Sequence, residues 1–181
     1  MISPTSLNTE IVIQPMNKRH VRAVRVIDKQ VYPKPWSVGM YHDELKQPAN
    51  RIYLVASQND LLVGYGGAML VHDEGHITSI AVNPEAQGNQ IATRLLWGIH
   101  RGCQNKEAAS MTLEVRVSNE RAQALYRRFG YVPAGVRAKY YGDNNEDALI
   151  MWCHDIQETE HTERLAELKS QLTGLTTWSI T

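Results

Sequence analysis

Two side chains in the second half of the sequence have the chemistry of a proton acceptor and a proton donor. Residues 114 to 126 read Glu-Val-Arg-Val-Ser-Asn-Glu-Arg-Ala-Gln-Ala-Leu-Tyr. Glu114 lies in an apolar strand pattern, and Tyr126 lies two turns into a helix that the Ser118-Asn119 pair can cap through a side-chain oxygen. A carboxylate can act as a general base and a phenol as a general acid. The spacing therefore predicts a base and an acid at the end of one strand-helix unit.

A second segment, further upstream, favours a functional interpretation over a purely structural one. Residues 77–82 have the pattern of a buried strand, Asn83-Pro84-Glu85 turns the chain, and residues 87–92 open a helix that runs to about Lys106. The first amides of a helix have no internal partner, and the helix dipole places partial positive charge there. We therefore expect an anion site, suited to phosphate, at this loop.

At this point the chain resembles the GNAT acetyltransferases. Their acetyl-CoA loop reads Gln/Arg-x-x-Gly-x-Gly/Ala between a strand and a helix; Gln87 matches the first position and Ala92 the last. Gln90 stands where the family has its central glycine. Because a glycine there lets the backbone approach phosphate closely, we expect Gln90 to point away from the phosphates and to weaken acetyl-CoA binding, and Gln90→Gly to tighten it by about 0.5 to 2 kcal/mol.

Further motifs resemble one type within this family. Leu-Glu-Val-Arg-x-Ser-Asn at residues 113–119, followed by Ala-Leu-Tyr at 124–126, is similar to the bacterial RimI type, which acetylates the N-terminal alanine of ribosomal protein bS18. Pro35-Trp36-Ser37 and the stretch from Tyr140-Tyr141 to residue 151 also fit that type. The resemblance covers about residues 10 to 156 and implies acetyl-CoA as co-substrate, no metal, and the N-terminus of a protein, such as Ala-Arg-Tyr-Phe, as acceptor.

The resemblance also implies roles for individual residues. Glu114 would be the catalytic base and Tyr126 the catalytic acid. The residues implied to bind acetyl-CoA are Ile80, Ala81, Val82, Gln87, Gly88, Asn89, Gln90, Ile91, Ala92, Thr93, Asn119 and Tyr126. The residues implied to flank the acceptor are Tyr32, Trp36, Tyr140 and Tyr141.

The chemistry of amines favours an α-amino acceptor. An α-amino group titrates near 7.7 to 8.0 and a lysine near 10.4, so deprotonation at neutral pH costs about 1 to 1.4 kcal/mol for the first and about 4.6 kcal/mol for the second. One carboxylate can therefore serve an α-amine. Tyr126 can then pass a proton to the departing sulfur of CoA.

The pattern along the chain predicts an α+β fold with one mixed, mostly antiparallel sheet of about seven strands and about four helices. Residues 1–156 form the expected GNAT domain. In residues 157–181 we expect a short helix, with leucines at helical spacing up to residue 172, and then a flexible tail without regular structure. Asn59-Asp60 is a hairpin signal, and the glycines at 64–67 lie inside a strand pattern, where they indicate close packing or a bulge.

Composition excludes several function classes. The 181 residues include 19 basic and 19 acidic side chains, so a broad basic surface for nucleic acid is not expected. Cys103 and Cys153 do not have the spacing of metal ligands and are expected to be reduced thiols in the core. His72 and His76 are expected to lie in a hairpin rather than in a zinc site. The sequence has no apolar run long enough for a membrane span and no signal-peptide pattern, which predicts a cytoplasmic protein. The expected oligomeric state is a monomer or weak dimer.

Two alternatives remain open. One is a GNAT enzyme with another acceptor, such as a lysine side chain, a polyamine or an antibiotic. The other is a non-catalytic binding module, suggested by Gln90 and opposed by the presence of both Glu114 and Tyr126.

Overall fold

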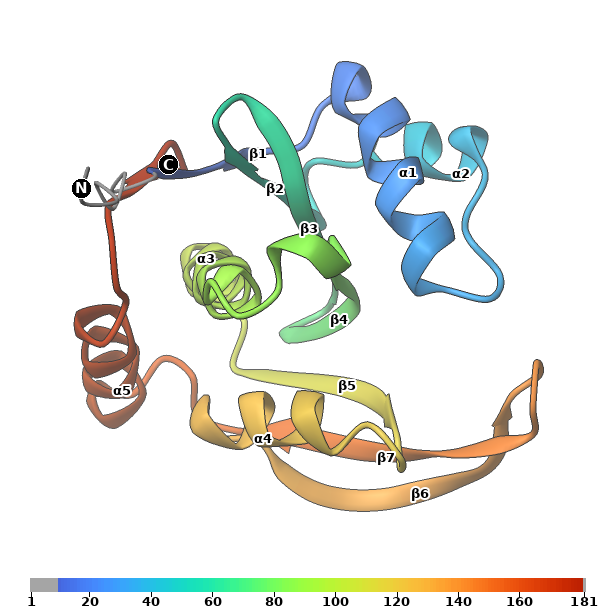
Figure 1. The fold of residues 1–181 in the computed structure, drawn as a ribbon. Coiled ribbons are helices and arrows are strands. Elements are labelled where there is room, and N and C mark those ends of the chain that lie inside the picture. The colour runs from blue at the N-terminus through green and yellow to red at the C-terminus, as the bar shows by residue number, and fades with distance from the viewer. Residues whose placement is uncertain (1–9, 181) are drawn as a thin grey trace, which may run out of the picture.

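The computed structural model describes residues 10–180, which form one mixed sheet with helices on both faces (Figure 1). The strands are β1 (Ile11–Pro15), β2 (Arg51–Gln58), β3 (Leu61–Val71), β4 (Glu74–Val82), β5 (Ser110–Arg116), β6 (Val132–Tyr141), β7 (Glu146–Cys153) and β8 (Thr176–Trp178). The α-helices are α1 (Val21–Val31), α2 (Val38–Glu44), α3 (Ile91–Asn105), α4 (Glu120–Arg128) and α5 (Thr159–Ser170).

The strands follow the order β6-β7-β5-β4-β3-β2-β1-β8. The pairs β4–β5 and β1–β8 are parallel, and the other neighbours are antiparallel. The predicted α+β class with a mixed, mostly antiparallel sheet is thereby confirmed. Within residues 10–180, every helix is too short or too polar to span a bilayer.

Local sequence signals explain where several elements begin. Asn17, Ser37 and Asn119 each accept, through a side-chain oxygen, an amide from the first turn of the helical segment that follows, at 3.1 Å in all three cases. Asn59 and Asp60 both have positive φ, 50° and 61°, as a tight hairpin between β2 and β3 requires. The cap predicted at the Ser118-Asn119 pair and the predicted hairpin are therefore confirmed.

The two faces of the sheet are covered by different helices. Leu95, Leu96 and Ile99 of α3 are fully buried on one face, together with apolar side chains of α4 and α5. The helices α1 and α2 cover the other face, where a second apolar cluster forms. Burying one such side chain stabilises the fold by about 1.5 to 3 kcal/mol, so each helix is held mainly by its apolar stripe.

The C-terminal segment differs from the prediction. The helix α5 forms as expected and adds Leu165 and Leu168 to the core beside α3. The tail expected to lack regular structure instead forms β8, which pairs with β1 and gives eight strands and five α-helices in residues 10–180. The three residues of β8 are too few to show the alternating side-chain pattern of a strand in the sequence. They form a strand because they pair with the edge of β1. The domain boundary at residue 156 stays a prediction.

A chain of hydrogen bonds between buried neutral groups joins α5 to this core. Tyr131 Oη lies 3.2 Å from His100 Nε2, His100 Nδ1 lies 3.0 Å from His161 Nε2, and His161 Nδ1 lies 3.8 Å from Cys153 Sγ. The Cys153 thiol donates to the Phe129 carbonyl at 3.4 Å. With one proton on each ring, every donor meets an acceptor. If both histidines were charged, N–H would face N–H between the two rings.

This chain predicts an acid-sensitive fold. Burial lowers the pKa of His161 to about 4, and it lowers the pKa of His100, while an unfolded histidine titrates near 6.5. Because the unfolded state binds protons first, stability present above pH 6.5 is lost as the pH falls toward 4. For His161 alone, we expect the free energy of unfolding, measured with urea, to drop by about 2 kcal/mol between pH 7 and pH 5. His161→Phe should flatten this dependence; an equally steep fall in that variant would contradict the assignment.

Candidate active site

The central feature of the site is a separation between β4 and β5. The two strands pair over three residues only, and His76 opposite Thr112 is the last pair. Beyond it the strands diverge (Figure 1). In the described chain, the rest of β4 up to Val82 therefore has no strand on that side to satisfy its backbone groups. This divergence of β4 and β5 after His76 is called the fork. It leaves a free edge of β4 with which an extended ligand can pair.

A groove of about 580 Å³ lies beside this edge and is lined by β4, the start of α3 and the helix α4. All the residues predicted to bind acetyl-CoA line it except Asn89, whose side chain donates to the Ala86 carbonyl at 3.1 Å. A second cavity, of about 590 Å³, lies between α3 and β2 and is lined by neither Glu114 nor Tyr126. The residues predicted to bind acetyl-CoA, apart from Asn89, are thus brought together at this groove, whereas Glu114 and the four predicted acceptor residues do not line it.

The loop before α3 sets the end of this groove. The sequence pattern suggested that the helix begins at residue 87. Gly88 and Gln90 have positive φ, 90° and 56°, so α3 begins at Ile91 instead. Its first internal bond is from the Arg94 amide to the Gln90 carbonyl, at 3.1 Å. The amides of residues 91–93 therefore have no acceptor inside the helix, which is the arrangement expected of an anion site.

Glu114 lies on β5 just beyond the last β4–β5 pair, and its side chain is only 7% exposed. One carboxylate oxygen lies 2.7 Å from His76 Nε2, across the fork, and the other lies 3.2 Å from Arg137 Nη2 on β6. Three strands thus fix the position of one carboxylate. A buried carboxylate held by partners on both sides differs from an ordinary surface glutamate, which is solvated by water.

Tyr126 lines the groove from α4 and is 9% exposed. Its hydroxyl forms no hydrogen bond with a residue of 10–180. Burial raises its pKa above the usual 10, and the neighbouring Tyr32 and Tyr141 raise it further. Burial also raises the pKa of Tyr141 to about 12, with Glu114 among the charges that act on it. Tyr126 is therefore protonated at neutral pH, and Tyr141 lies near both the predicted acid and the predicted base.

The predicted acceptor residues come from the loop after α1 and from the end of β6, next to the β6–β7 turn; that loop and that turn face each other (Figure 1). Tyr32 donates to the Ile80 carbonyl at 3.1 Å, and Trp36 packs on the ring of Tyr41 at 5.3 Å. A side-chain carbon on Gly142 would lie 3.7 Å from Lys34 Nζ, so the loop after α1 approaches the β6–β7 turn.

The two tyrosines of β6 differ in exposure. Tyr140 is 46% exposed, whereas Tyr141 is half-buried. Their rings meet edge to face at 5.2 Å. Exposed aromatic side chains beside a groove are suited to contact a peptide.

Comparison with known proteins agrees with this geometry. The sequence matches the model of the Acetyltransferase (GNAT) family over residues 21–131. The chain belongs to the GNAT acetyltransferase family. It is 38% identical over 146 residues, covering 81% of this chain and 97% of the relative, to a Bacillus subtilis (strain 168) protein with the provisional name ribosomal protein bS18-alanine N-acetyltransferase.

Solved structures show the same GNAT fold. The crystal structure of the ribosomal protein bS18-alanine N-acetyltransferase from Escherichia coli has a TM-score of 0.73 at 28% identity, over 80% of this chain and 94% of that chain. The NatC complex bound to Gag peptide and CoA has a TM-score of 0.72 at 22% identity, over 80% of this chain and 98% of that chain.

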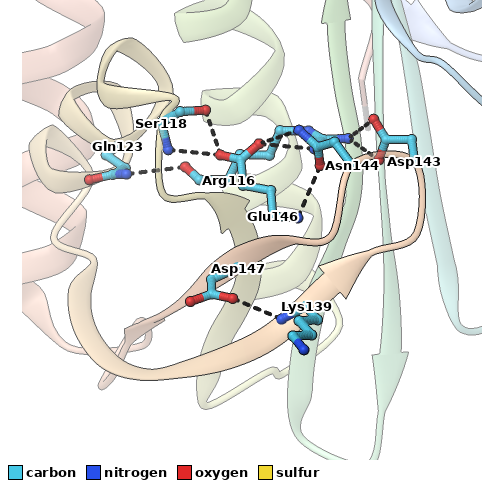
Figure 2. Close-up of polar contacts among 8 residues, drawn as sticks. All are labelled: Arg116, Ser118, Gln123, Lys139, Asp143, Asn144, Glu146 and Asp147. Atoms are coloured by element: carbon cyan, nitrogen blue, oxygen red, sulfur yellow. Dashed lines mark hydrogen bonds and ion pairs between the residues drawn. The ribbon is translucent and has the colours of Figure 1, made fainter.

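A polar network in this GNAT chain anchors the β6–β7 turn to the end of β5 (Figure 2). Arg116 donates to both oxygens of Asp143, at 2.8 and 3.0 Å, and to Asn144 and Glu146, both at 3.0 Å. Its guanidinium also lies 3.9 Å from the centre of the Tyr141 ring. Hydrogen bonds from Ser118 lower the pKa of Glu146 to about 2, so the network is ionised at neutral pH.

Several residues of the site were not found from the sequence. The sequence pattern places His76 in a hairpin and gives Arg137 no role. The described residues contain no group of three or more side chains suited to hold a metal. Arg121 and Arg128 line the groove from α4 and add positive charge beside the anion site. Their seven-residue spacing places them on one face of α4, a signal that the sequence did contain.

Arg116→Lys tests the network. A lysine cannot make the forked contacts of a guanidinium or stack in the same way. We expect faster hydrogen exchange at residues 141–146 and a loss of about 1 to 2 kcal/mol of stability. Arg164→Lys, which alters an exposed pair on α5, is the control. Unchanged exchange at the turn would show that Arg116 does not anchor it.

Proposed function

We propose that this chain transfers the acetyl group of acetyl-CoA to the α-amino group of a protein N-terminus, with the N-terminal alanine of ribosomal protein bS18 as substrate. The observation that carries the proposal is the placement of Glu114 at the fork and Tyr126 in the groove beside it. The names of the relatives supply the substrate class.

The groove supplies the contacts that acetyl-CoA requires. The free edge of β4 at residues 80–82 can pair with the amide groups of pantetheine, and it can polarise the thioester carbonyl. The amides that open α3 would hold the pyrophosphate. Arg121 and Arg128 add positive charge where the phosphates of CoA would lie.

Glu114 and Tyr126 divide the proton transfers. Glu114 takes a proton from the α-amine, directly or through a water, while the nitrogen forms a bond with the thioester carbon. Tyr126 then gives its proton to sulfur as the carbon–sulfur bond breaks, so the products are the acetylated N-terminus and CoA. His76 and Arg137 hold the Glu114 carboxylate in one position for this work.

The loop after α1 and the end of β6 would receive the peptide. Tyr32, Trp36, Tyr140 and Tyr141 flank the space between them, which is consistent with an N-terminus entering from the side opposite the cofactor. The proposed domain responsible is residues 1–156, and the expected compartment is the cytoplasm.

The assignment of base and acid can be tested by substitution. We expect Glu114→Gln to lower turnover about 100-fold at pH 7 and less at pH 9, where more of the substrate amine is already neutral. Tyr126→Phe should lower turnover with little change in acetyl-CoA affinity, because the hydroxyl acts only on the leaving sulfur. Rates on an Ala-Arg-Tyr-Phe peptide, with Glu160→Gln on α5 as the control, would decide this. Wild-type rates in both variants would refute the roles.

The acceptor is tested by mass spectrometry. We expect acetylation of the α-amine in a peptide beginning Ala-Arg-Tyr-Phe and none in a blocked peptide with a free lysine. The reason is the difference of about 3 kcal/mol in the cost of deprotonating the two amines, with one carboxylate available as base. An acetyl group found on the lysine would assign the chain to a different acceptor class.

A further inference from the structure

The side chain of Gln90 leaves the cofactor loop and binds the C-terminal segment. Its amide nitrogen donates to the Gln171 carbonyl at 3.2 Å. Its amide oxygen accepts from the backbone amide of Thr173 at 2.8 Å and from the Thr173 hydroxyl at 3.0 Å. The residue that departs from the family pattern therefore uses all of its polar atoms to join two parts of the chain that are about 80 residues apart.

Arg94 makes the same connection from inside the protein. Its side chain is buried, with 1% of the residue exposed, and it donates to the Asn89 carbonyl at 2.8 Å. The same guanidinium donates to Thr176 Oγ1 at 2.8 Å and to the Thr173 carbonyl. A planar guanidinium can satisfy three acceptors in different directions, and leaving a buried charge without them is costly. The guanidinium of Arg94 thus joins the loop to the C-terminal segment.

The C-terminal segment is itself anchored on both sides of these contacts. Before them, α5 packs in the core beside α3. After them, Trp178 packs on Trp97 at 4.5 Å between ring centres, and the amide of Ser179 donates to the Ile13 carbonyl at 2.8 Å. A segment held at both ends can transmit its position to the loop that it touches.

We propose that residues 171–178 form a brace that holds the pyrophosphate loop in its binding conformation, and that Gln90 and Arg94 are positioning residues that connect the brace to the loop. The inference rests on the proposed function, in which this loop binds acetyl-CoA. A residue other than glycine is disfavoured at positive φ, so Gln90 needs compensation. The three hydrogen bonds between the Gln90 side chain and the brace supply it.

The contacts of Gln90 reverse the effect expected of Gln90→Gly from the sequence. For the backbone alone, glycine is the better residue at this position. In the folded chain, Gln90→Gly also removes the connection to the brace, and we now expect weaker acetyl-CoA binding. The binding of acetyl-CoA and the ordering of the brace must also favour each other equally, because coupling between two sites is reciprocal.

The first experiment compares acetyl-CoA affinity by titration calorimetry in the full-length chain. Gln90→Leu keeps the size and the backbone penalty of Gln90 and removes its hydrogen bonds, and Thr173→Val removes only the hydroxyl partner. We expect Gln90→Leu to weaken binding about 5- to 20-fold and Thr173→Val about 2- to 5-fold. The double variant should bind acetyl-CoA no more weakly than Gln90→Leu alone, because both substitutions break the same connection between the loop and the brace. Gln47→Leu, at an exposed position beside β2, is the matched control.

Steady-state kinetics distinguish a role in positioning the loop from a general loss of structure. In Gln90→Leu the KM for acetyl-CoA should rise about as much as the dissociation constant, while kcat and the KM for the peptide stay within twofold of wild type. In hydrogen exchange, acetyl-CoA should slow exchange at residues 171–178 in the wild type and not in Gln90→Leu. Exchange at the distant turn of Asn59 and Asp60 should not change in either.

Each outcome bears on a different proposal. Wild-type affinity in both Gln90→Leu and Thr173→Val, or no protection of residues 171–178 by acetyl-CoA, would overturn the brace and leave the proposed function standing. Tighter binding by Gln90→Gly would also overturn it. If the wild-type chain did not bind acetyl-CoA at all, the proposed function and the brace would both fail.

Discussion

The short parallel contact between β4 and β5 is the constraint on which the rest of the site depends. Because pairing stops after His76, one edge of β4 is free of any other strand in the described chain, and the groove follows that edge. The same divergence leaves Glu114 at the fork, where His76 can reach it across the opening. If the two strands paired along their whole length, the sheet would close and the groove would be lost.

Polar side chains hold the elements around this opening, each by contacts that cross from one element to another. Glu114 joins β5 to β4 and β6, and Arg116 joins the end of β5 to the β6–β7 turn. Arg94 joins α3 to the C-terminal segment. Partly buried charges are costly unless paired, so each of these residues favours the one arrangement in which its partners meet. Apolar packing keeps the helices on the sheet, and these pairs set the finer geometry of the groove.

The C-terminal part of the chain is integrated with the rest rather than appended to it. Its helix shares the core beside α3, its strand extends the sheet, and the segment between them contacts the cofactor loop. The histidine pair ties the same helix to β7 through groups that burial keeps neutral at pH 7. Acid would therefore act on the same part of the molecule that supports the loop.

Much of this protein was determined by local sequence. Helix caps at Asn17, Ser37 and Asn119, the hairpin at Asn59-Asp60 and the loop before α3 all depend on residues close together in the chain, so their signals can be read directly. The motif around Glu114 and Tyr126 likewise indicated the family, the candidate acid and the candidate base. Only the tertiary structure decided that His76 and Arg137 meet Glu114, that Thr176 to Trp178 form a strand, and that Gln90 binds residues 171 and 173. Those contacts depend on strand register and on the meeting of distant segments, which no local pattern encodes.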